Sequence, residues 1–137
     1  MKMRSHCPIN FSLEHFGDKW TLLIIRDLMF KDKRHYNEFF ESNENVSTSV
    51  LGDRLKQLEE SGIIKKEADS VKKSRIKYSL TPKGIALLPL MIEMIVWGGT
   101  FDTDTEANQD FLDQANNHRE LLVSSTREQL EKDHLPS

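Results

Sequence analysis

The stretch from Asn45 to Glu67, NVSTSVLGDRLKQLEESGIIKKE, decides the fold of this 137-residue chain. Ser47 is a good N-cap, because its hydroxyl can accept a hydrogen bond from a backbone N–H in the first turn of a helix. The apolar residues that follow recur at helical spacing, at Leu51, Leu55 and Leu58. Gly62 then suits the left-handed backbone position that commonly ends a helix. We therefore predict an amphipathic helix between Ser47 and Gly62, with one narrow buried face.

The residues before this helix predict three further helices. Cys7-Pro8 opens a short helix that ends near Gly17, and a buried helix follows over residues 19–30 with Asp18 as its cap. A third, short helix covers residues 35–42. A polar turn joins it to the helix after Ser47, which places two consecutive helices on either side of a tight turn.

The residues after Gly62 predict a β-hairpin. Two stretches, 63–68 and 76–80, have the composition and alternation of strands, and residues 69–75 form a polar, basic loop between them. Two helices joined by a tight turn and followed by a basic hairpin form a winged helix-turn-helix, whose usual partner is duplex DNA. The predicted fold class is mainly α with a small β-hairpin wing (α+β).

The C-terminal part of the chain differs in charge from the rest. The net charge is −3 overall, but residues 1–100 carry +3 and residues 101–137 carry −6. We expect one helix from Pro82, kinked at Pro89, and a last helix over about residues 106–132. The chain is therefore divided into a winged helix-turn-helix DNA-binding domain with dimerisation helices (1–100) and an acidic C-terminal helical extension (101–137).

Composition excludes several classes of protein. The single cysteine, Cys7, excludes an internal disulfide and fits a reducing compartment. No signal peptide is visible, and the longest apolar run, residues 85–97, is too short to span a bilayer. We expect a cytoplasmic protein without a membrane partner. Because no glycine-rich phosphate loop, nucleophile elbow or HExxH motif occurs, and His6, Cys7 and His15 match no zinc spacing, we expect no enzyme, cofactor or metal.

The sequence resembles the HxlR-type transcriptional regulators, a branch close to the MarR-like winged-helix proteins. The matching pieces stand in order along the chain: CPIN (7–10), GDKWTLLIIRDL (17–28), RHYNEF (34–39), VSTSVLGDRLKQLEESGII (46–64) and YSLTPKG (78–84). The resemblance implies a homodimeric DNA-binding repressor or activator, often responsive to small molecules or reactive electrophiles.

The residues themselves indicate which helices would build the dimer that the resemblance implies. The N-terminal helix and the helices after Thr81 carry more apolar surface than a small winged core can cover, so we expect them to form the dimer. Two-fold symmetry then predicts a pseudo-palindromic operator. The alternative is a winged-helix protein–protein interaction module that does not bind DNA, and such a module would not need a basic loop.

The predicted reading residues lie at the start of the helix after Ser47, because that end of a recognition helix reaches the base edges. They are Ser47, Thr48, Ser49, Asp53, Arg54 and Lys56. Ser47 also caps the helix, and Thr48 and Ser49 are expected to contact bases or phosphates. The alternative is that Ser47 only caps the helix and the other two side chains are simply solvated. Asp53 either accepts a hydrogen bond from a cytosine amine or pairs with a neighbouring cation. Arg54 either reaches a backbone phosphate or supports that pairing.

Two further groups of cations are expected to contact the DNA backbone. The wing carries Lys72, Lys73 and Arg75, which suit phosphate neutralisation or entry into the minor groove. Lys33 and Arg34, at the start of the short helix, are expected on the other flank.

Cys7 lies next to a helix N-terminus, where a thiol can have a lowered pKa and sense oxidants. The alternative is a small buried hydrophobic residue. Aromatic and methionine residues, among them Trp20, Phe39 and Trp97, either line a small-molecule effector pocket or form ordinary core.

Overall fold

The computed structural model describes residues 3–136, and the chain divides into two compact units between Thr81 and Pro82. Each unit is described by itself. The division lies well before residue 100, where the sequence suggested a boundary. The basic hairpin and the helix after Ser47 thus belong to one unit, and the apolar helices after Thr81 belong to the other.

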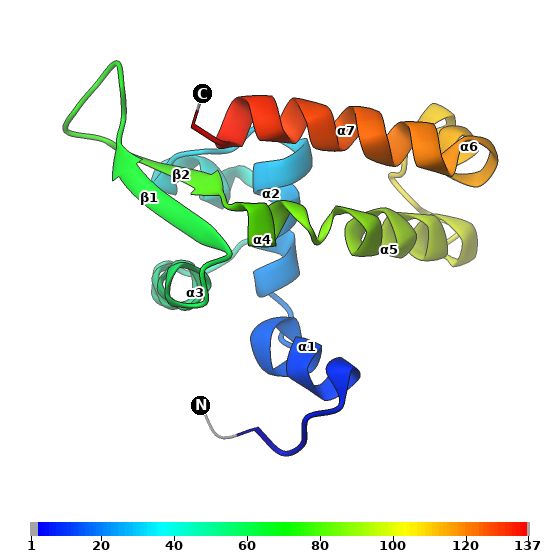
Figure 1. Cartoon of the computed structure of the whole chain (residues 1–137), viewed down its shortest axis with the longest axis horizontal. Helices are drawn as coiled ribbons and strands as arrows, with labels where there is room; N and C mark the ends of the chain where they lie inside the picture. Colours follow the sequence, from blue (N-terminus) through cyan, green and yellow to red (C-terminus); the bar gives the residue numbers. More distant parts are fainter. Residues whose placement is uncertain (1–2, 137) are drawn as a thin grey trace. The chain divides into compact units, whose positions relative to one another are not determined.

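The first unit contains the winged helix-turn-helix (Figure 1). In order, its elements are α1 (Pro8–Phe16), α2 (Thr21–Phe30), the 3₁₀ helix η1 (Tyr36–Glu41), α3 (Thr48–Glu60), β1 (Ile64–Ala68) and β2 (Ile76–Leu80). This is the predicted order of elements. The predicted short helix before the turn is a 3₁₀ helix rather than an α-helix.

Local signals fix both ends of α3. The Ser47 hydroxyl accepts a hydrogen bond from Val50 N at 3.3 Å, which confirms the predicted cap. The backbone of Gly62 has φ +76°, a left-handed conformation that glycine adopts without the steric cost of a Cβ atom. The three leucines of α3 are buried, as their spacing predicts. The helix is therefore held on the core by one face, and its opposite face is exposed.

The hairpin is antiparallel, with Ile64 opposite Leu80 and Ala68 opposite Ile76. A third extended segment runs beside β2, because His35 forms an isolated bridge with Lys77 and Tyr78 N donates to Arg34 O at 2.7 Å. The residues just before η1 are thus joined to the hairpin by backbone hydrogen bonds. The loop between the strands extends beyond the ends of β1 and β2 (Figure 1).

The second unit is entirely helical among the described residues. Its helices are α4 (Pro82–Ile85), α5 (Leu88–Phe101), α6 (Gln109–Asn117) and α7 (Arg119–His134). Here α5 and α7 run antiparallel (Figure 1). By length and composition alone residues 82–101 could cross a membrane, but a core helix of a soluble protein passes the same test. In the structure these residues form two helices, α4 and α5.

Two helix predictions in this unit are wrong. Instead of one helix kinked at Pro89, the chain forms α4 and α5, with Pro89 in the first turn of α5, where its missing N–H costs nothing. The single helix expected over residues 106–132 is divided at His118, whose backbone is not helical (φ −141°, ψ 49°). The adjacent Asn116 and Asn117 are poor helix formers, which favours a break there.

Candidate nucleic-acid interface

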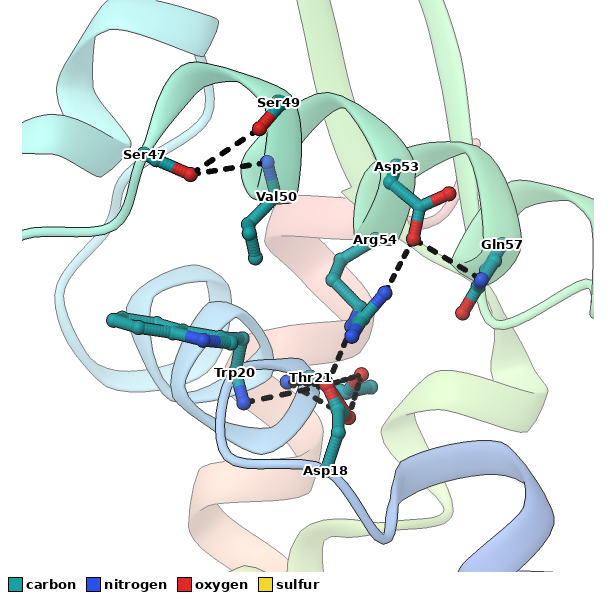
Figure 2. Close-up of polar contacts among 9 residues, drawn as sticks. All are labelled: Asp18, Trp20, Thr21, Ser47, Ser49, Val50, Asp53, Arg54 and Gln57. Atoms are coloured by element: carbon teal, nitrogen blue, oxygen red, sulfur yellow. Dashed lines mark hydrogen bonds and ion pairs between the residues drawn. The ribbon is translucent and has the colours of Figure 1, made fainter.

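The start of α3 presents hydroxyl groups to solvent. Ser47, Thr48 and Ser49 are all exposed. The Ser47 hydroxyl caps the helix and lies 3.5 Å from the Ser49 hydroxyl (Figure 2). The backbone carbonyl of Thr48 accepts a weak hydrogen bond from the Tyr36 hydroxyl at 3.4 Å, which links α3 to η1. The side chains of Thr48 and Ser49 are exposed at this end of α3, and their contact with DNA stays a prediction.

One turn further along α3, Asp53 is paired within the protein. Its carboxylate accepts hydrogen bonds from the Arg54 guanidinium and, at 3.2 Å, from Gln57 Nε2 (Figure 2). The predicted pairing of Asp53 with a neighbouring cation is therefore confirmed. This pairing neutralises a carboxylate that would otherwise repel a phosphate.

Arg54 also reaches away from α3 to Asp18, which precedes α2. Arg54 Nε donates to Asp18 Oδ2 at 2.5 Å (Figure 2). Asp18 in turn accepts from Trp20 N at 3.3 Å, and from Thr21 N and the Thr21 hydroxyl. Partial burial opposes ionisation of Asp18, but the hydrogen bonds from Thr21 and Arg54 outweigh it and lower the pKa of this carboxyl. Asp18 therefore binds the first N–H groups of α2, although the helix begins at Thr21, two residues later than predicted, with Trp20 in the N-cap position, and Asp18 also ties α2 to α3.

The loop over residues 69–75 has a defined hydrogen-bonded shape. Asp69 N donates to Arg75 O at 2.8 Å, and Arg75 N donates to Lys72 O at 2.9 Å. The Asp69 carboxylate accepts from Val71 N at 3.1 Å and from Lys72 N at 2.9 Å, both through Oδ2. The side chains of Lys72, Lys73 and Arg75 are exposed. The three predicted wing cations are thus displayed on a loop that its own backbone and Asp69 hold in shape.

Arg34 does not have the position that was predicted for it. Its side chain is only 8% exposed. The guanidinium donates to Tyr78 O at 2.7 Å and to the Ser79 hydroxyl at 2.6 Å. This geometry argues against the predicted phosphate contact and gives Arg34 a role in anchoring β2. Lys33 is largely covered, with its ammonium nitrogen 3.9 Å from Asp27 Oδ2, and its phosphate contact stays a prediction. Lys56 is exposed on α3.

His35 forms a contact between η1 and the wing loop that the sequence does not predict. One ring nitrogen, Nδ1, lies 2.8 Å from Glu38 Oε1, and the other, Nε2, lies 3.1 Å from Asp69 Oδ1. His35 and Glu38 are three residues apart, a spacing at which side chains on one helical turn can meet, and this could have suggested the first contact. No local signal could have suggested the second, because the partners are 34 residues apart.

Cys7 is exposed and directly precedes α1, with Pro8 in the first turn. The alternative reading as a buried hydrophobic residue is therefore wrong. Hydrogen bonds from the backbone N–H groups of Asn10 and Ile9 lower the pKa of the Cys7 thiol. A lowered pKa raises the thiolate fraction, which is the form that reacts with oxidants and electrophiles.

The described residues offer little support for a metal site or an enclosed effector pocket within the first unit. No group of three or more His, Cys, Asp or Glu side chains within residues 3–136 could hold a metal ion. Trp20 and Phe39 border a void of only about 10 Å³, which is too small for a ligand. In the second unit, Trp97 is exposed. An effector therefore stays a prediction.

A hydroxyl-rich recognition helix and a basic hairpin loop in one compact unit define a winged-helix transcriptional regulator. Residues 15–106 match the HxlR-like helix-turn-helix family, and the chain belongs to this family. It is 31% identical over 107 residues to the HTH-type transcriptional regulator YybR of Bacillus subtilis strain 168, covering 78% of this chain and 79% of YybR.

Two solved structures extend the comparison. The transcription factor PA1607 has a TM-score of 0.68 and 30% identity, covering 77% of this chain and 72% of that one. The oxidised form of the redox regulator HypR has a TM-score of 0.62 and 30% identity, covering 72% of this chain and all of HypR. The resemblance found in the sequence is thus confirmed, as are the winged-helix fold class and the function of a DNA-binding transcriptional regulator.

Proposed function

We propose that this regulator binds a pseudo-palindromic operator as a homodimer, with α3 in the major groove and the 69–75 loop on the adjacent backbone. The observation that carries the proposal is the exposure of Lys72 and Lys73 on a hydrogen-bonded loop in the same unit as the exposed start of α3. In a two-fold dimer the two recognition helices would lie about 34 Å apart, one turn of B-DNA.

Two exposed apolar surfaces support the homodimer. On α1 no residue is buried, and Ile9 and Leu13 are exposed one helical turn apart. On α5 the exposed apolar side chains follow spacings of four, three and four residues, at Leu90, Met94, Trp97 and Phe101. This is the spacing of a helix seam that packs against another helix. Large exposed apolar stripes are costly in a monomer, so a second copy of the chain would cover them.

The experiment first selects bound duplexes from a random pool and then measures the affinity for the selected duplex between 50 and 200 mM salt. Lys72→Ala/Lys73→Ala is the test variant, because it leaves the backbone bonds between Asp69 and Arg75 in place. Arg127→Ala/Lys132→Ala is the matched control, since it removes the same charge from exposed positions on α7.

If each wing lysine contacts one phosphate, the dimer makes four such contacts. The plot of the logarithm of the association constant against the logarithm of the salt concentration should then be shallower in the wing variant, with a slope smaller in magnitude by about 3 to 4. The control should keep the wild-type slope. Equal slopes in the wild type and the wing variant would refute the wing assignment. Selection of a site without two-fold symmetry would refute the dimeric operator.

A second function, a response to thiol oxidants, is supported by the exposed Cys7 with its lowered pKa and by the likeness to the redox regulator HypR. Because the chain has one cysteine, a disulfide would join two chains. Two thiols would then lose two electrons and two protons to an oxidant such as diamide, which is reduced to the hydrazine. Diamide should change the operator affinity of the wild type and leave that of Cys7→Ser unchanged; an equal change in both would exclude Cys7 as the sensor.

A further inference from the structure

The imidazole of His35 lies between two carboxylates from different elements. Its Nδ1 faces Glu38 on η1 at 2.8 Å, and its Nε2 faces Asp69 in the wing loop at 3.1 Å. The side chain is 14% exposed, so water does not readily replace either partner. His35 is therefore a bridge between the helix-turn-helix and the wing.

The chemistry of the two partners selects one charge state of the ring. A neutral imidazole has one N–H donor and one lone pair, whereas an imidazolium has two donors. An ionised carboxylate only accepts. Both contacts can thus be hydrogen bonds only in the imidazolium, and loss of the proton leaves a lone pair facing a carboxylate oxygen.

Both carboxylates stay ionised where an imidazole titrates. The backbone N–H of Lys72, followed by His35, lowers the pKa of Asp69 to about 2. Partial burial opposes ionisation of Glu38, but hydrogen bonds from the Arg34 N–H and from His35 outweigh it and lower the pKa of Glu38. The two groups that face the ring are therefore both charged hydrogen-bond acceptors.

Asp69 transmits the state of the ring to the wing. It uses Oδ2 to accept the N–H groups of Val71 and Lys72, while Oδ1 faces His35. The carboxylate that shapes the start of the loop is thus the same carboxylate that the imidazolium holds. A change at His35 therefore acts on the backbone that displays Lys72.

We propose that His35 is a positioning residue for DNA binding: its imidazolium holds Asp69 and the wing loop in the binding conformation, so operator affinity falls as rising pH removes the proton. The inference rests on the proposed DNA binding. The other charged groups around the bridge are Arg75, near Asp69, and Lys77, whose backbone pairs with His35. Lysine and arginine side chains keep their charge across the range tested, so they do not supply the titration.

The test measures operator affinity from pH 5.5 to 8.5 at constant ionic strength for three proteins. The wild type should bind progressively more weakly as the pH rises, by at most about tenfold per chain for each pH unit, since each chain must regain one proton to bind. His35→Gln cannot donate at both contacts, and it should bind weakly with a flatter profile. His35→Arg carries a permanent cation with several donors, and it should bind with the low-pH affinity of the wild type throughout.

A second readout separates positioning from general stability. In the wild type, the backbone amide resonances of Val71 and Lys72 should shift over the same pH range as the operator affinity and the His35 ring resonances, while the far-UV circular dichroism stays that of the folded protein. Parallel pH profiles for the wild type and both variants would overturn the proposal, because the other histidines would then supply the titration. Absence of operator binding by the wild type at every pH would instead overturn the proposed function.

Discussion

Replacing Arg54 tests whether this residue binds DNA or holds the recognition helix in place. It lies beside the reading end of α3, and its guanidinium is shared between Asp18 and Asp53. The Arg54 and Asp18 side chains are only 23% and 27% exposed. We expect Arg54→Ala to destabilise the first unit and to weaken DNA binding mainly because the position of α3 becomes less well defined.

The magnitude follows from the burial of the pair. A hydrogen bond to a charged group contributes about 1.5–3 kcal/mol when it is shielded from water. An exposed ion pair contributes about 0.2–1 kcal/mol. At roughly a quarter exposure, Arg54→Ala should lower the free energy of unfolding by about 1–2 kcal/mol. Asp18→Ala also removes the acceptor for Trp20 N and Thr21 N. Loss of a helix cap costs about 1 kcal/mol more, so the total should be about 2–3 kcal/mol.

The assay is urea unfolding of the two single variants and the double variant. The chain has two tryptophans, Trp20 and Trp97. In a Trp97→Phe background the fluorescence of Trp20 reports on the first unit alone. The two changes should not be additive, with a coupling energy of about 1 kcal/mol between the partners. Lys56→Ala, at an exposed position on the same helix, is the matched control and should stay within about 0.5 kcal/mol of the wild type.

The reasoning would be refuted by an Arg54→Ala protein of wild-type stability whose operator affinity and salt slope both fall as they do for a lost phosphate contact. In that case the ion pair with Asp18 contributes nothing, and the guanidinium belongs to the DNA interface. Purely additive effects of the Asp18 and Arg54 changes would lead to the same conclusion.

Three further predictions concern the core, the dimer and acid stability. Leu55 is 3% exposed, so Leu55→Ala should lower the free energy of unfolding in urea by about 2–5 kcal/mol; a loss below 1 kcal/mol would mean that α3 is not held by its leucine face. Trp97 is 66% exposed, so Trp97→Glu should give a folded monomer in sedimentation velocity where the wild type is a dimer, and an unchanged dimer would place the interface elsewhere. The pKa of Asp69 is about 2, below its ordinary value, so its stabilising effect is present above about pH 4 and is lost as the pH falls towards 2. Asp69→Asn should therefore be less stable than the wild type near neutrality and lose less stability in that acid range, as followed by circular dichroism.

Features set by neighbouring residues could be predicted from the sequence. The cap at Ser47 and the left-handed Gly62 each depend on one side chain and its own backbone. The leucine face of α3 follows from periodicity, and the basic loop follows from composition. The same local reasoning failed at His118, because two poor helix formers just before it favour a break only weakly over continuation of the helix.

Contacts between distant residues could not be predicted. Arg54 and Asp18 are 36 residues apart, and Arg34 and Ser79 are 45 apart. In the sequence, Arg34 and Lys72 are both cations near a predicted DNA-binding surface. Their difference arises only in the fold, where one lies against β2 and the other projects from a loop. A count of cations therefore overestimates the number that remain available for phosphate.

The two long-range side-chain contacts have a common consequence for how DNA binding should respond to salt. The Arg54–Asp18 pair ties α3 to the start of α2, and the His35–Asp69 contact ties the wing to η1. Both surfaces proposed to face DNA are thus positioned by polar side-chain contacts, and salt screens exposed charges strongly but partly buried ones much less. Because all four side chains are largely shielded, the positions should persist at salt concentrations that already release the phosphates. The slope of log association constant against log salt concentration should then report the number of phosphate contacts alone. The plot should depart from a straight line only in variants that have lost the Arg54–Asp18 or the His35–Asp69 contact.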